Sequence, residues 1–168
     1  MQTEQADGNG GYASGFEYLR NLREQQSTPA PFERMLGFRL QRVSEGEVEL
    51  LAHPVDECAN PMGTVHGGYF AALLDAAMGA SVHSLLDAHH DFTTVDLKVS
   101  FMKALRSPFT PLRALGSVRR SGKRVMFAEG QIYSGTNTLI ATATATCLIW
   151  ERPIDNRREV THGHKKST

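Results

Sequence analysis

The chain of 168 residues has few cysteines and no excess of either charge. Its only cysteines are Cys58 and Cys147. Two are too few for a disulfide framework or for a zinc site made of four cysteines, and no metal site is expected. The 18 Lys and Arg residues balance the 18 Asp and Glu residues. Without a basic excess the chain lacks the usual surface of a nucleic-acid binder, so no nucleic-acid partner is expected.

The amino-terminal segment also lacks a basic region and an apolar run. It therefore does not resemble a secretory signal, and the cytoplasm is the expected location. The length fits one domain. Composition divides the chain into an extension over residues 1–31 with a short amphipathic helix from Phe16, a folded domain over residues 32–150, and a polar tail over residues 151–168.

The folded domain alternates between patterns typical of strands and of helices. A short helix at residues 31–36 is expected to stop at Gly37. In residues 95–101 apolar and polar side chains alternate strictly, which predicts a strand with Val95, Leu97, Val99 and Phe101 on one face. The whole series predicts strands at residues 38–43, 47–53, 95–101, 112–118, 125–133 and 141–149, with a long helix at residues 67–86. Short connections favour antiparallel pairing, so the fold class is α+β.

The predicted long helix is apolar on nearly every side, which is typical of a buried helix. Asp75 is the only permanently charged residue in it. With no second apolar span to shield this charge, a membrane helix is unfavourable and no membrane partner is expected. Asp75 is either a structural carboxylate with hydrogen-bond partners or a general base or nucleophile in a cleft.

A loop rich in turn-forming residues, NPMGTVHGG at residues 60–68, precedes this helix. Free backbone amides at a helix start favour negative charge, and the glycines would let a substrate approach them. Such amides can form an oxyanion hole for a carbonyl oxygen. The alternative is a tight loop whose His66 is hydrogen-bonded.

Gly67 and Asp75 are eight residues apart, which is about 12 Å along a helix axis. One carbonyl group cannot contact both positions. If both act on one substrate, Asp75 must come from a second copy of the chain across a two-fold axis. The spacing therefore predicts a dimer with two composite sites.

The pattern Asn60…GTVHGG…Asp75, followed by TTVDL…FM at residues 93–102, resembles the hotdog-fold acyl-CoA thioesterases, most closely the PaaI-type branch of phenylacetate degradation. The resemblance covers about residues 32–150. It implies a long central helix wrapped by a curved antiparallel sheet. It also implies that two protomers form one continuous sheet and that two dimers form a tetramer.

By position in that family, Asn60 and the Gly67 amide would bind and polarise the thioester, while His66 supports the loop. Asp75 of the second copy would activate water or attack directly, and Thr94 would orient the water, although Thr93 is an alternative. The resemblance implies an aromatic or medium-chain acyl-CoA substrate and no cofactor beyond the CoA it carries. A hotdog hydratase or dehydratase and a non-catalytic acyl-CoA-binding protein are the alternatives.

A basic cluster surrounds the turn at residues 121–124, and by resemblance it would bind the CoA phosphates. The zero net charge hides this cluster, because residues 1–97 carry 14 acids and 5 bases whereas residues 98–168 carry 4 acids and 13 bases. A solvated hairpin is the alternative interpretation. The expected CoA-binding residues are Gly68, Arg120, Gly122, Lys123 and Arg124.

Overall fold

A computed structural model describes residues 13–25, 30–106, 109–135 and 137–152. In these residues the helices are α1 (Gly15–Glu24), α2 (Pro31–Leu36) and α3 (Gly67–His83), with a short 3-10 helix η1 (Asp56–Cys58). The strands are β1 (Phe38–Ser44), β2 (Glu47–Ala52), β3 (His90–Phe101), β4 (Leu112–Ser121), β5 (Val125–Ser134) and β6 (Leu139–Glu151). Residues 1–12 of the expected extension and residues 153–168 of the expected tail lie outside the described residues.

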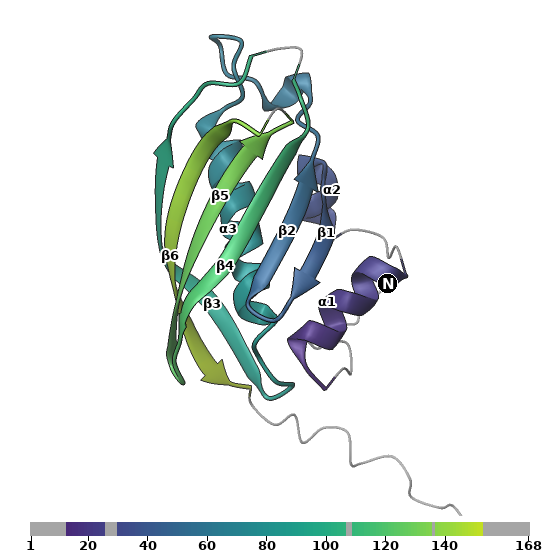
Figure 1. The fold of residues 1–168 in the computed structure, drawn as a ribbon, viewed down its shortest axis with the longest axis vertical. Coiled ribbons are helices and arrows are strands. Elements are labelled where there is room, and N and C mark those ends of the chain that lie inside the picture. Colours follow the sequence, from purple (N-terminus) through teal and green to yellow (C-terminus); the bar gives the residue numbers. More distant parts are fainter. Residues whose placement is uncertain (1–12, 26–29, 107–108, 136, 153–168) are drawn as a thin grey trace, which may run out of the picture.

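All six strands form one antiparallel sheet in the order β1-β2-β4-β5-β6-β3. The sheet curves around α3, which lies along its inner face (Figure 1). The predicted α+β architecture, a long helix wrapped by a curved antiparallel sheet, is confirmed. The helix predicted from Phe16 is α1, and it packs mainly beside β1.

Two glycines seat α3 directly on the sheet. Gly116 on β4 and Gly130 on β5 are partners in the strand register. A Cβ atom at Gly116 would collide with the carbonyl oxygen of Ala77, and one at Gly130 would lie 2.8 Å from Cδ2 of Leu74. This close approach buries one side of α3 completely. None of the helices in the described ranges is long and apolar enough to cross a membrane.

Helix α3 ends at His83, three residues before the predicted end at Leu86. The hydroxyl of Ser81 donates to the carbonyl of Met78, and that of Ser84 donates to the carbonyl of Ser81, both at 2.7 Å. The amide of Leu86 then bonds to the carbonyl of His83, three residues back. Serine hydroxyls that compete for backbone groups favour such a terminal turn, which hydropathy alone does not reveal.

The strict alternation predicted for residues 95–101 is wrong at its first position. Thr94 pairs with Cys147 of β6 and Asp96 pairs with Thr146, so Val95 is an extra residue in a β-bulge and is 59% exposed. Beyond the bulge Leu97 and Val99 pair with inward-facing alanines of β6, as the alternation requires. Because a bulge depends on the neighbouring strand, its position is not encoded by the hydropathy of β3 itself.

Candidate active site

The loop before α3 is held by the side chain of Asn60. Its Oδ1 accepts hydrogen bonds from the backbone amides of Met62 and Thr64, at 3.0 and 3.2 Å, while its Nδ2 donates to Oγ1 of Thr64 at 2.8 Å. Gly63 lies in this turn with φ of 70°, a left-handed conformation that favours glycine. The hydrogen bonds of the Asn60 side chain therefore fix the conformation of the loop that leads into the helix.

His66 is the N-cap of α3. Its Nδ1 accepts a hydrogen bond of 2.8 Å from the amide of Gly68, so the proton of the neutral ring lies on Nε2. The His66 carbonyl accepts from the amide of Tyr69. Among the described residues the amide of Gly67 has no acceptor. One backbone donor therefore remains at the positive end of the helix dipole, as an oxyanion hole requires.

The ring of Phe101, the last residue of β3, lies against Gly67. A Cβ atom at Gly67 would be 3.0 Å from Cζ of that ring. The Phe101 ring is also 6.4 Å from the ring of Phe70, centroid to centroid. A side chain at position 67 would therefore require the Phe101 ring to shift by a few tenths of an ångström, a contact that the sequence did not predict.

Asp75 faces the middle of β3. Helix α3 runs antiparallel to β3, because Gly67 lies against Phe101 while a Cβ atom at Gly79 would lie 3.4 Å from the ring of Phe92. Asp75 lies between those two contacts. Its Oδ1 atom is buried and has no hydrogen-bond partner among the described residues. A buried carboxylate oxygen without a partner is costly, which argues against a purely structural, hydrogen-bonded Asp75.

Cys147 of β6 lies near Asp75, and Thr94 of β3 is the hydrogen-bond partner of Cys147. Oγ1 of Thr94 lies 3.9 Å from Sγ of Cys147, a weak hydrogen bond across β3 and β6. Burial raises the pKa of the Cys147 thiol, the bond to Thr94 opposes this, and the negative charge of Asp75 adds to it. The thiol therefore stays neutral at pH 7. Thr93, the alternative to Thr94, pairs with Leu148 and is exposed on the outer face.

Sequence reasoning missed Cys147 as a neighbour of Asp75. The signal was present in the strand ATATATC at residues 141–147, where every second residue is small and buried. Cys147 continues the inward-facing set of β6, whose members face the helix.

The basic cluster of the β4–β5 turn lies at the other end of the sheet from Gly67. Val125 pairs with Leu148 near this turn, whereas Ile132 pairs with Ala141 near Phe101. Seven residues separate Val125 from Ile132, about 23 Å along a strand. The lower end of the sheet in Figure 1 holds the turn, and the upper end holds the loop before α3.

Within the cluster Arg119 is paired with Glu129 at 2.7 Å. Arg120, Lys123 and Arg124 are exposed, and no ion pair to another described residue is found for them. Gly122 lies in the turn between the strands. The free cations therefore coincide with the predicted CoA-binding residues, while Gly68 is separate from them at the start of α3.

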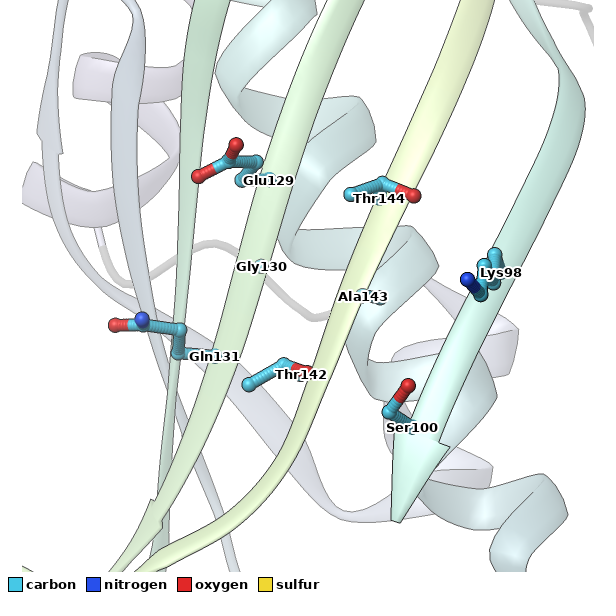
Figure 2. A pocket seen from close by; sticks show the side chains of 8 residues that line it. All are labelled: Lys98, Ser100, Glu129, Gly130, Gln131, Thr142, Ala143 and Thr144. Atoms are coloured by element: carbon cyan, nitrogen blue, oxygen red, sulfur yellow. The ribbon is translucent and has the colours of Figure 1, made fainter. Parts of the chain in front are cut away.

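A hollow of about 300 Å³ lies on the outer face of the sheet, over β3, β5 and β6. Figure 2 shows that Thr142 and Thr144 project into it between Glu129 on one side and Lys98 and Ser100 on the other. Asp75 and Gly67 belong to the helix on the opposite face. The hollow is thus separate from the candidate site. No group of three or more His, Cys, Asp or Glu residues in the described ranges could hold a metal ion.

A helix on a curved antiparallel sheet, with a free amide at its start and a half-buried carboxylate in its middle, is the arrangement of a hotdog-fold thioesterase. Similarity to known proteins supports the same family. Residues 62–141 match the family model of the thioesterase superfamily. The medium/long-chain acyl-CoA thioesterase YigI of Salmonella typhimurium is 30% identical in an alignment of 135 residues that covers 71% of this chain and 85% of that protein. The chain belongs to the thioesterase superfamily.

Solved structures place the chain near the PaaI type. A phenylacetic acid degradation-related protein of Ralstonia eutropha JMP134 is 28% identical, with a TM-score of 0.70 over 78% of this chain and 98% of that one. The PaaI protein of the Escherichia coli phenylacetic acid degradation operon has the same TM-score at 16% identity, over 80% and 95% of the two chains, and supports the fold alone. The predicted resemblance to PaaI-type hotdog thioesterases is confirmed.

Proposed function

We propose that this chain hydrolyses acyl-CoA thioesters at active sites composed of two copies of the chain. The observation that carries this proposal is the buried, unpartnered Oδ1 of Asp75, which lies about 12 Å along α3 from the free Gly67 amide. The charge of Asp75 acts on the Cys147 thiol, the hydrogen-bond partner of Thr94. Within one chain these groups do not converge. Antiparallel helices across a two-fold axis would bring the Gly67 amide of one copy to the Asp75 of the other.

In the proposed reaction the thioester carbonyl oxygen accepts a hydrogen bond from the Gly67 amide. Asp75 of the second copy takes a proton from a water molecule oriented by Thr94, and the water oxygen attacks the carbonyl carbon. The C–S bond then breaks, CoA leaves as a thiolate that takes up a proton, and the acid is released. In the alternative route the carboxylate attacks that carbon, CoA leaves, and water hydrolyses the resulting anhydride to release the acid and restore Asp75. A donor to the developing oxyanion contributes about 10²–10³ in rate.

The proposed substrates carry a medium-chain or an aromatic acyl group. The name of the Salmonella relative supports the first class, and the phenylacetic acid degradation-related protein supports the second. The exposed Arg120, Lys123 and Arg124 would bind the CoA phosphates together with the backbone of Gly122. Gly68 would contribute from the start of α3. Dimers are the proposed functional unit, and two dimers would form a tetramer.

Mixed dimers test the composite site. Asp75→Asn and Gly67→Val chains are each expected to be inactive, since the first lacks the carboxylate and the second places a branched side chain where the thioester must approach the backbone amide. Coexpressed in equal amounts, they should recover about one quarter of the wild-type rate of thiol release from hexanoyl-CoA, because one site in each mixed dimer is intact. Activity that stays absent in verified mixed dimers contradicts a shared site. Tight binding by wild type without thiol release would favour a non-catalytic acyl-CoA-binding protein.

A further inference from the structure

Phe101 ends β3, and its ring edge points to the place that a Cβ atom would occupy at Gly67. The place of a Cβ atom at Gly67 is 3.0 Å from Cζ and 3.4 Å from both Cε atoms of this ring. The buried ring of Phe70 supports it, with 6.4 Å between centroids and 43° between ring planes. The position of the Phe101 ring is therefore defined by two neighbours on α3.

The outer part of this ring is nevertheless open. Phe101 is 57% exposed and the following Met102 is 56% exposed, whereas Phe70 is 3% exposed. A large apolar surface next to a free backbone donor is the combination by which proteins contact the apolar part of a ligand and orient its polar group. The Gly67 amide would thus supply a hydrogen-bond donor, and the Phe101 ring beside it would supply an apolar surface.

The distances constrain what this surface accepts. An oxygen that accepts from the Gly67 amide lies about 2.9 Å from that nitrogen. The ring lies on the side of the same glycine where a Cβ atom would be, with Cζ 3.0 Å from that place. The carbonyl carbon carries the thioester sulfur, which leads to the polar CoA, and the acyl carbon. The apolar ring suits the acyl carbon better than the CoA side, so the acyl carbon next to the carbonyl is the one that would lie beside the ring.

We propose that Phe101 is a specificity-determining residue whose ring excludes substituents on the acyl carbon next to the thioester carbonyl. The inference rests on the proposed thioesterase function and specifies its substrates. Acyl groups with CH₂ at that carbon are accepted, which includes straight chains and phenylacetyl. Acyl groups branched there, such as isobutyryl and benzoyl, are rejected.

Butyryl-CoA and isobutyryl-CoA test this proposal, because they have the same atoms and differ only in branching at that carbon. In Phe101→Ala the ratio of kcat/KM for isobutyryl-CoA to that for butyryl-CoA should rise about tenfold or more over wild type, the usual effect of one methyl group in an apolar site. Phe101→Leu should give a smaller rise. Phe127→Ala is the matched control, since Phe127 is a 45% exposed phenylalanine on the outer face of β5.

The outcomes separate this inference from the proposed function. In one outcome, wild type hydrolyses butyryl-CoA while Phe101→Ala changes kcat/KM for both substrates by the same factor. That result would overturn the role of Phe101 and leave the proposed thioesterase function intact. Wild type that releases thiol from neither substrate nor from hexanoyl-CoA overturns both proposals. Circular dichroism and Tm report the folding of each variant, and if Phe101→Ala does not fold, an unchanged ratio in Phe101→Leu refutes the proposal.

Discussion

The start and the middle of α3 use opposite means to place a polar group. At the start a backbone amide is free because the loop and the cap satisfy its neighbours through Asn60 and His66. In the middle a side-chain carboxylate is half-buried with one buried oxygen, near Cys147 of β6, which is hydrogen-bonded to Thr94 of β3. The first environment is made by nine consecutive residues, and the second is made by three segments distant in the chain.

This difference explains why a thioesterase of this kind is expected to need two chains. A rigid helix holds the donor and the base about 12 Å apart, so neither group can move to meet the other. An antiparallel pair of helices removes the separation without strain, and each copy then supplies the donor of one site and the carboxylate of the other.

The largest expected effect comes from the carboxylate. Asp75→Asn should keep the fold and the oligomer but lower kcat at least about 10²-fold, because an amide cannot accept the proton or attack the thioester. Steady-state thiol release measures the rate. Asp96→Asn is the control, since Asp96 is exposed on β3 and pairs with Thr146. A folded Asp75→Asn protein with the wild-type rate would exclude Asp75 as the general base or nucleophile.

Removal of the Thr94 hydroxyl should have the next largest effect on kcat. Thr94→Val replaces it with a methyl group of similar size, and the loss of one hydrogen bond to the reacting water should lower kcat about tenfold. Thr93→Val makes the same change on the outer face of the same strand and should leave kcat unchanged. Equal effects of the two variants would argue against orientation of water by Thr94.

The basic turn should act on binding instead of chemistry. Reversal of two charges, Arg120→Glu with Lys123→Glu, should raise KM for hexanoyl-CoA severalfold with little change in kcat, because the reacting groups are untouched. The short thioester S-hexanoyl-N-acetylcysteamine lacks the phosphates, and its KM should not change. A similar rise in KM for both substrates would exclude phosphate binding by this turn.

The smallest effect is expected at the cap. His66→Ala removes the acceptor of the Gly68 amide and should lower the free energy of unfolding by about 1 kcal/mol. His66→Asn supplies a new side-chain acceptor at the N-cap, so its free energy of unfolding should fall by less than that of His66→Ala. Denaturant unfolding compares the two variants with wild type. Equal losses would show that His66 acts through something other than the cap.

Much of the fold follows from local patterns. The buried character of α3, the order of the strands along the chain and the turn from residue 60 into the helix depend on residues close in sequence, so they were predictable. The end of α3 and the bulge at Val95 were not, because serine back-bonding and register against β6 decide them. The periodicity of hydropathy reports neither the hydrogen bonds of serine hydroxyls to the backbone nor the register of β3 against β6.

The candidate site divides in the same way. The loop, the capped helix start and the lone carboxylate of Asp75 were visible in the sequence because glycine, histidine and aspartate are unusual in those positions. The PaaI-type resemblance added their proposed roles. Thr94 could be named only together with Thr93, and the bulge decides between their placements by turning Thr94 inward to Cys147.

The sequence by itself determined a zero net charge divided into an acidic and a basic part, a long apolar helix with one acid, and a glycine loop before it. Only the tertiary structure decided that the basic turn lies at the opposite end of the sheet from Gly67, that Gly116 and Gly130 seat the helix, and that Phe101 covers Gly67. The physical reason is that strand register and side-chain packing join residues far apart in the chain, which local composition and periodicity do not specify.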